Sequence, residues 1–326
     1  MENLPNISIN LIVKNEEKRI ADAINSVKLF ASEIIVIDTG STDSTPQICT
    51  RMGCEVYYHS WNDNFSEMRN IALGYSSMEW ILVIDSDEVA RFSLLDLPLE
   101  QMNDPKIGGI NLQIINHIDE NDDSIISKHR YTRLFRNDKS VRFTGRIHEQ
   151  IRESIEGKFE IYDSELIIEH FGYRTIDKEK LERNTRLLEQ DIEADADDWK
   201  YYHLAETLFS GGDKDKSRTI FERIVSSPEL TDLQLDRVKT RLGQLYLGSD
   251  RYNEAESILS FVSEDKDTEG LRQYVLAAVK LSTGFVDEAL VLYNSRDIEL
   301  SDLVDKNQLK VALQGAKQYK SIIEKK

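Results

Sequence analysis

The sequence predicts two domains of different fold class: a mostly parallel α/β sheet domain over residues 1–175 and an all-helical repeat domain over residues 176–326. Two observations lead to this division. Through residue 85, short apolar runs alternate with segments of helical period, which is typical of parallel strands joined by crossover helices. From about residue 176 the period is helical throughout, and a pattern of small and large side chains recurs. At roughly 150 residues per domain, 326 residues suffice for two separate cores.

The first four predicted strands are short apolar runs rich in β-branched residues: Ile7–Val13, Glu33–Asp38, Glu55–His59 and Trp80–Asp85. The second run is apolar at consecutive positions, which suits a strand covered on both faces. Between the strands, helices are predicted over Asn15–Leu29, from Asp43-Ser44-Thr45-Pro46 to Gly53, and over Phe65–Ser76. This alternation implies right-handed crossovers and a parallel sheet. Two further strands, Gly109–Asn116 and Ser124–Leu134, are predicted to form a hairpin with its turn at Asp119–Asp123.

The helical half repeats a pattern of residues. Leu204-Ala205, Leu208, Ser217 and Phe221 recur as Leu242-Gly243, Tyr246, Ala255 and Leu259, and again as Leu276-Ala277, Lys280, Ala289 and Tyr293. The spacings of 38 and 34 residues are typical of tetratricopeptide repeats, with a generic helical bundle as the alternative. Leu309–Ile323 is expected to form a capping helix. Such an array offers a surface for a peptide or protein, or an interface for a homodimer.

The composition is that of an ordinary soluble protein, with 40% hydrophobic residues, 31% charged residues and a net charge of −18. Phosphate backbones and anionic lipid heads repel so acidic a chain, so we expect neither nucleic-acid binding nor membrane binding through a basic face. No apolar stretch approaches the ~20 residues of a membrane helix, and Met1 to Asn10 shows no signal peptide. The two cysteines, Cys49 and Cys54, suggest neither a disulfide framework nor a zinc site. We therefore expect a cytoplasmic protein.

Polar or acidic residues follow three of the predicted strands: Lys14-Asn15-Glu16 the first, Asp38 the second and Asp85-Ser86-Asp87 the fourth. Because ligands of parallel sheets bind beyond the carboxyl ends of the strands, these residues predict one shared site. The usual glycine-rich phosphate cradles, G-x-G-x-x-G and G-x-x-x-x-G-K-[ST], are absent from the sequence. A bound phosphate therefore needs another counter-charge. Two carboxylates at positions i and i+2 can supply it by holding Mg²⁺ or Mn²⁺.

These segments resemble the family 2 glycosyltransferases, which have the GT-A fold. The resemblance rests on Ile9–Glu16, Ile34–Thr45, Ile81–Glu88 and the triplet Met68-Arg69-Asn70 between the third and fourth strands. Three later segments are similar to one branch of the family, the bacterial glycosyltransferases with C-terminal tetratricopeptide repeats: Arg133–Arg136, Gly145–Gln150 and His170–Tyr173. That branch is similar to the peptide S-glycosyltransferases that modify glycocin-type bacteriocins. The resemblance covers nearly the whole chain and leaves the acceptor open.

The resemblance implies a nucleotide-sugar site made of Glu16, Asp38, Arg69, Asp85 and Ser86. Asp38 is expected to hydrogen-bond the nucleotide base, and Glu16 to line the same pocket. Arg69 is expected to approach the nucleotide or its diphosphate. Asp85 is expected to contact both the ribose and the metal. Taken alone, Arg69 is also compatible with an ion pair on a helix surface.

The resemblance also implies a metal site for Mg²⁺ or Mn²⁺ made of Asp85, Asp87 and His170. Glu149 is the expected catalytic base, with His148 as a second candidate and Asp138 as a third. Glu149 is also compatible with a charge at a strand edge, and His170 with a hydrogen-bonded core histidine.

The function that the resemblance implies is metal-dependent, inverting transfer of a sugar from a nucleotide-diphosphate sugar to a peptide, protein or glycan acceptor. A uridine nucleotide is the expected donor. Two alternatives come from other classes: a repeat scaffold fused to an inactive transferase domain, and a sugar nucleotidyltransferase. The second needs a glycine-rich, basic loop after the first strand, and Lys14-Asn15-Glu16 is not such a loop.

Overall fold

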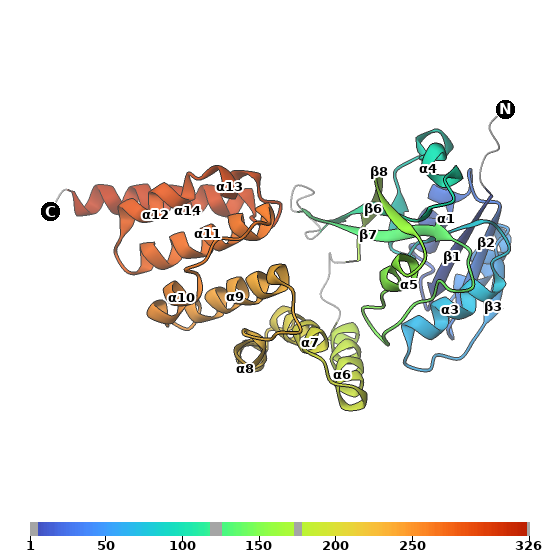
Figure 1. The fold of residues 1–326 in the computed structure, drawn as a ribbon, viewed down its shortest axis with the longest axis horizontal. Helices are drawn as coiled ribbons and strands as arrows, with labels where there is room; N and C mark the ends of the chain where they lie inside the picture. Colours follow the sequence, from blue (N-terminus) through green and yellow to red (C-terminus); the bar gives the residue numbers. More distant parts are fainter. Residues whose placement is uncertain (1–5, 118–125, 173–177, 325–326) are drawn as a thin grey trace. The chain divides into compact units, whose positions relative to one another are not determined.

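The computed structural model describes residues 6–117, 126–172 and 178–324. The chain divides into two compact units, Met1–Ile176 and Asp177–Lys326. The first is built around an eight-stranded sheet and the second is helical, which confirms the predicted fold class (Figure 1). Among the described helices, none combines the length and apolar character that crossing a membrane requires.

The sheet has the strand order β3-β2-β1-β4-β7-β6-β8-β5. Its parallel half consists of β1 (Ile7–Val13), β2 (Glu33–Asp38), β3 (Glu55–Tyr58) and β4 (Trp80–Val83). Its other half consists of β5 (Glu88–Ala90), β6 (Ile107–His117), β7 (Ile126–Arg136) and β8 (Glu160–His170). There β7 runs antiparallel to both β4 and β6, β8 runs parallel to β6, and β5 runs antiparallel to β8. The turn predicted at residues 119–123 lies outside the described residues.

Helices cover both faces of the parallel half. They are α1 (Ile20–Val27), α2 (Thr45–Arg51) and α3 (Phe65–Tyr75), and the segment between β5 and β6 adds the 3₁₀ turn η1 (Leu94–Asp96) and α4 (Leu99–Asn103). In β2, Ile34 and Val36 pack into the core that contains α1, whereas Ile35 and Ile37 pack against α3. The consecutive apolar residues of β2 are thus explained by burial on both faces.

Several predicted elements are shorter in the structure, and local backbone geometry explains two of these differences. The strand predicted to reach Asp85 ends at Val83, because the backbone N–H of Asp85 donates to the Glu88 carboxylate (2.8 Å) instead of continuing a ladder. The helix predicted from Asn15 begins at Ile20. Asn15 has a positive φ of 59°, a conformation in which a helix cannot start, and Glu16 closes a turn by accepting from Arg19 and Ile20.

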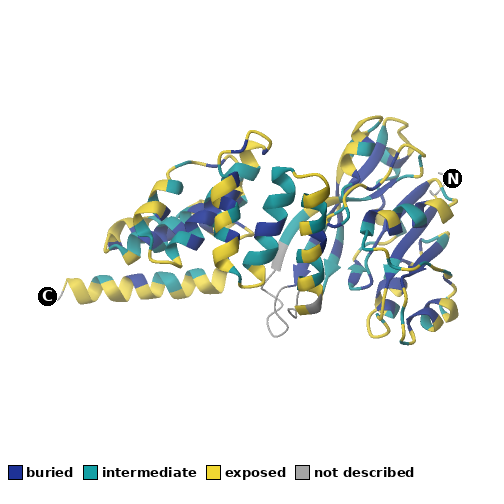
Figure 2. Ribbon diagram, turned by 90° about the horizontal axis from the view of Figure 1, so that it is seen from below, coloured by how far each residue is buried: buried dark blue, intermediate teal, exposed yellow. Residues whose placement is uncertain are grey.

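The second unit contains nine described helices: α6 (Lys178–Ala194), α7 (Asp198–Ser210), α8 (Lys214–Ile224), α9 (Asp232–Leu247), α10 (Tyr252–Ile258), α11 (Lys266–Ser282), α12 (Val286–Tyr293), α13 (Arg296–Leu300) and α14 (Lys306–Ile323). The recurring small residues Ala205, Ser217, Ala255 and Ala289 are fully buried. A Cβ atom at Gly243 would lie 2.6 Å from the Leu259 side chain, so glycine allows a closer helix contact here than alanine does at the equivalent positions of the other repeats. Figure 2 shows buried residues along the inner helices, whereas the last helix, α14, is largely exposed.

Candidate active site

The loops that follow β1 and β2 are tied together at the carboxyl edge of the sheet. The backbone N–H of Asn15 donates to the Ser41 hydroxyl (2.9 Å), and the Asn15 side-chain oxygen accepts from the Thr42 N–H (2.7 Å). The N–H of Glu16 donates to the Thr45 hydroxyl (2.7 Å). These bonds place Glu16 next to the loop that follows Asp38, as the shared site requires.

Asp38 ends β2 with one carboxylate oxygen satisfied and one unpaired. Its Oδ1 accepts from the backbone N–H groups of Gly40 (3.0 Å) and Ser41 (2.9 Å). Its Oδ2 is buried and has no hydrogen-bond partner among the described residues. Because a buried acceptor without a donor is costly, this oxygen suits a ligand that brings an N–H or O–H group.

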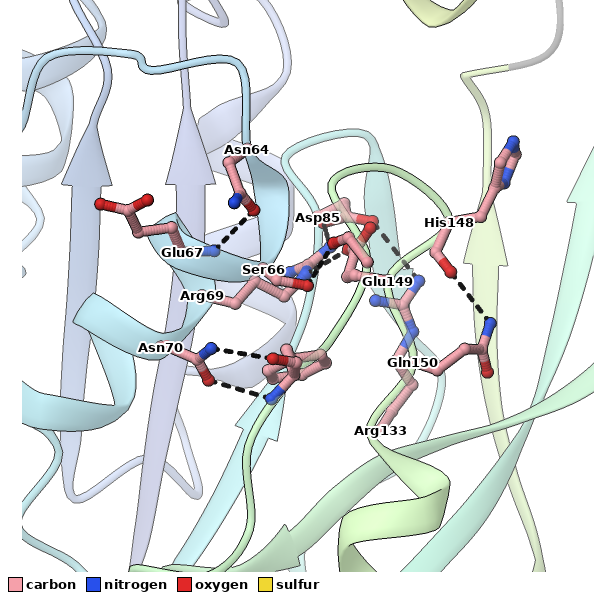
Figure 3. A network of polar contacts seen from close by, with 12 residues as sticks. Asn64, Ser66, Glu67, Arg69, Asn70, Asp85, Arg133, His148, Glu149 and Gln150 are labelled. Atoms are coloured by element: carbon pink, nitrogen blue, oxygen red, sulfur yellow. Dashed lines mark hydrogen bonds and ion pairs between the residues drawn. The ribbon is translucent and has the colours of Figure 1, made fainter. Parts of the chain in front are cut away.

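Asp85 lies between two arginines (Figure 3). Arg69 Nη2 of α3 is 3.0 Å from Asp85 Oδ1, and Arg133 Nη2 of β7 is 3.4 Å from Asp85 Oδ2. Burial alone would raise the pKa of Asp85, but the two guanidinium groups hold that pKa well below its usual range. Asp85 is therefore an anion with both oxygens engaged.

Arg69 joins Asp85 to Glu149. Its Nε is 2.5 Å from Glu149 Oε1, and its side chain is only 8% exposed. The ion pair is thus buried rather than on a helix surface. The Arg69 guanidinium contacts two protein carboxylates and little solvent. Arg69 Nη1 is buried and has no hydrogen-bond partner among the described residues.

Sequence reasoning missed two members of this network, Glu88 and Arg133. Glu88 Oε2 accepts the Asp85 backbone N–H, and Glu88 Oε1 is 2.8 Å from Arg133 Nη2. Burial raises the pKa of Glu88, although Arg133 opposes that effect. Both residues stand in segments that carry the family resemblance, Ile81–Glu88 and Arg133–Arg136, but no local pattern distinguishes them from ordinary strand residues.

Asp87 and His170 meet because β5 pairs with β8, with Glu88 opposite His170 in the register. His170 Nε2 is 3.4 Å from Asp87 Oδ1, and the Phe171 N–H donates to the Asp87 carbonyl (3.0 Å). Burial alone would lower the pKa of His170, but Asp87 and the neighbouring carboxylates raise it above its ordinary value. A pocket of about 530 Å³, lined by Ser86 and Asp87 among others, opens beside the pair.

The backbone of Gly172 packs closely against the same two side chains. A Cβ atom at this position would lie 2.1 Å from Asp87 Oδ2 and 2.7 Å from His170 Nε2. Within the residues that the structure describes, no three His, Cys, Asp or Glu side chains form a metal site by themselves. Asp87 and His170 offer one hard oxygen and one imidazole nitrogen, and Asp87 lines the neighbouring pocket. This donor set fits a divalent cation that takes its remaining ligands from diphosphate oxygens and water.

The three candidate bases lie in different surroundings. Glu149 borders the Asp85 network, and its Oε2 accepts no hydrogen bond among the described residues. His148 has a positive φ of 52° and an exposed side chain that points away from Glu149 in Figure 3, while its carbonyl accepts from Gln150 (3.1 Å). Asp138 is paired with Lys158 (2.5 Å), which holds its pKa below the usual range. The structure thus brings Glu149 to the Asp85 network and gives Asp138 other partners.

Comparison with known proteins gives a family match and several relatives. Residues 8–182 match the family described as glycosyl transferase family 2. The chain is 31% identical over 205 residues to the SPbeta prophage-derived glycosyltransferase SunS of Bacillus subtilis, which covers 60% of this chain and 47% of that protein. It is 32% identical over 149 residues to a TPR repeat-containing protein of Synechococcus elongatus, which covers 46% of this chain and 36% of that protein. The chain thus spans less than half the length of these relatives.

Two solved structures show weaker likeness. The glucosyl-3-phosphoglycerate synthase of Mycobacterium tuberculosis, in complex with Mn²⁺ and uridine-diphosphate-glucose, is 24% identical with a TM-score of 0.30, covering 34% of this chain and 44% of that one. TarS of S. aureus is 17% identical with a TM-score of 0.38, covering 88% of this chain and 90% of that one. The family match by itself spans more than half of the chain, and the chain belongs to glycosyl transferase family 2.

Proposed function

We propose that this protein is a metal-dependent, inverting glycosyltransferase. It moves a sugar from a nucleotide-diphosphate sugar, with uridine as the nucleotide, to a side chain of a peptide or protein or to a glycan. The observation that carries the proposal is the pairing of Asp87 with His170 beside the pocket that Asp87 lines. This pair adjoins the carboxylate network that contains Glu149.

The donor site follows from the residues at the strand ends. Asp38 Oδ2, buried and without a donor, accepts an N–H of the base, and Glu16 borders the same loop. Asp87 and His170 hold Mg²⁺ or Mn²⁺, which when bound stabilises the charge of the departing diphosphate. Asp85 retains 33% exposure of its side chain, so it can reach the ribose or a water molecule of the ion while the arginines hold it. Ser86, which lines the pocket beside Asp87, faces the same ligand.

Glu149 acts as the base. Its Oε2 takes the proton of the acceptor nucleophile while Arg69 holds its other oxygen. The nucleophile attacks the anomeric carbon from the face opposite the diphosphate, and this single displacement inverts the configuration there. The Glu149 carboxylate gains the proton, and the diphosphate leaves with the bonding electron pair.

The helical unit supplies no donor ligand in this proposal. It presents the acceptor or binds a second copy of the chain, since its recurring small residues build stacked helices of the kind that bind peptides and proteins. We expect the reaction to take place in the cytoplasm, where both nucleotide sugars and unmodified polypeptides are available.

Thermal unfolding in the presence of uridine nucleotides tests the proposal. A ligand at 100 times its dissociation constant stabilises a protein by about 2.7 kcal/mol. We expect the melting temperature to rise with UDP or a UDP-sugar together with Mn²⁺, and not with either alone. Asp87→Asn should remove the joint effect. If no nucleotide diphosphate shifts the melting temperature with any divalent cation, the proposed donor site is wrong.

A further inference from the structure

Asn116 of β6 links two histidines that the proposed mechanism does not connect. The residue is 4% exposed, and in the parallel ladder between β6 and β8 it stands opposite His170. Its side-chain Oδ1 is 2.8 Å from His170 Nδ1, and its Nδ2 is 3.1 Å from Nδ1 of His129 on β7. Three adjacent strands therefore contribute one polar chain that ends at the imidazole facing Asp87.

The chemistry of the amide determines where the protons lie. An amide oxygen only accepts, so His170 carries a proton on Nδ1, and Nε2, 3.4 Å from Asp87 Oδ1, is the nitrogen that can bind a cation once it has no proton. An amide nitrogen only donates, so His129 Nδ1 accepts. With the amide turned over, Asn116 would donate to His170 Nδ1, and the ring proton would move to Nε2, where it would block a metal bond. His129 with its proton on Nε2 favours the amide orientation that leaves Nε2 of His170 open, because its Nδ1 then accepts.

We propose that Asn116 is a positioning residue of the metal site: it holds His170 in the tautomer and orientation that can bind a divalent cation, and His129 holds Asn116. The inference rests on the proposed metal site but goes beyond it, because neither Asn116 nor His129 touches the ion. Replacing a partner of a metal-bound histidine typically lowers metal affinity about 10–100-fold.

Asn111 provides a matched control on the same strand. It is also an asparagine, 7% exposed, and its side chain bonds Asp163 and Thr132 at 2.6 Å each. Those partners belong to neither the metal pair nor the Asp85 network. A loss that comes only from disturbing a buried amide of β6 should therefore appear equally when Asn111 is replaced.

The test measures Mn²⁺ binding to the full chain by electron paramagnetic resonance of the free ion at pH 8, with and without UDP. Leucine and aspartate are both close in shape to asparagine, but only aspartate keeps the accepting oxygen. We expect Asn116→Leu to weaken Mn²⁺ binding about 10–100-fold. Asn116→Asp should stay within about threefold of the wild type or bind more tightly, and Asn111→Leu should stay within about threefold.

Each outcome has a distinct meaning. Wild-type affinity in Asn116→Leu, or an equal loss in Asn111→Leu, overturns the inference and leaves the proposed function standing. Absence of Mn²⁺ binding to the wild-type protein, with and without UDP, contradicts the proposed metal site itself. If Asn116→Leu fails to fold by circular dichroism, His129→Leu takes its place, because it removes the partner that orients the amide and keeps Asn116 itself. A loss of at least about fivefold is then expected, and no loss overturns the inference.

Discussion

Replacing Gly172 by alanine tests the close packing of its backbone against the proposed metal ligands. The added Cβ would lie 2.1 Å from Asp87 Oδ2 and 2.9 Å from Asp87 Cγ. Since carbon and oxygen atoms in ordinary contact are about 3.3 Å apart, the carboxylate must retreat by about 1 Å. Oxygen ligands bind Mg²⁺ at about 2.1 Å, so a retreat of this size removes Asp87 as a ligand. We expect Mn²⁺ affinity to fall at least about 100-fold, or ~2.7 kcal/mol.

The fold should tolerate the same change. The clashing atoms belong to the ends of two side chains, Asp87 and His170, and not to the backbone, and Gly172 does not have the positive φ that disfavours alanine. Titration calorimetry with Mn²⁺ and UDP measures the affinity, and circular dichroism the melting temperature. Gly74→Ala in α3 is the control: its Cβ meets nothing within 4 Å, so it should leave metal binding unchanged and stabilise the protein by about 0.5–1 kcal/mol. Wild-type Mn²⁺ affinity in Gly172→Ala would refute the reasoning.

Three further substitutions separate catalysis, electrostatics and packing. Glu149→Gln should keep UDP-sugar affinity but lower the initial rate of transfer to a hydroxyl acceptor by about 10²-fold or more. An unchanged initial rate would mean that another residue is the base. Arg69→Met leaves the carboxylates of Asp85 and Glu149 without their shared counter-charge. It should destabilise the first unit by about 3–5 kcal/mol in urea unfolding, and an unchanged midpoint would contradict the buried network. Gly243→Ala places a Cβ 2.6 Å from Leu259 and should lower the free energy of unfolding of the helical unit by about 1–3 kcal/mol. Mn²⁺ binding should not change.

Local periodicity accounts for most of the fold that could be predicted. The apolar run of β2 indicated burial on both faces, and the structure divides its side chains between two cores. The recurring small residues of the helical half, such as Ala255 and Ala289, indicated close helix contacts, and they are fully buried. In both cases the signal is contained within one element or one repeat, which is why sequence reasoning could find it.

The site was predictable only in part, because pairings between distant strands assemble it. Asp87 meets His170 through the register of β5 and β8. The family resemblance placed the two residues in one metal site, but no local pattern near either residue predicts the pairing. For the same reason, Asn116 could not be connected with His170 before the ladder between β6 and β8 was known. Arg69 was expected near the diphosphate. In the structure it is buried between the carboxylates of Asp85 and Glu149, and the position of Glu149, on a distant loop, could not be predicted from the residues around Arg69. Whether any of these residues contacts substrate stays a prediction.

The central claim is that the site at Asp87 and His170 uses a nucleotide-diphosphate sugar with the help of a divalent cation. Release of UDP from UDP-sugars by the full chain, with Mn²⁺ or with EDTA, measures this most directly. We predict that the wild-type protein releases UDP only with Mn²⁺. Asp138→Asn is the control and should behave in the same way, because the carboxylate that it removes pairs with Lys158. Asp87→Asn should release almost none under the same conditions. Release that persists in EDTA, or in Asp87→Asn with Mn²⁺, would contradict the account.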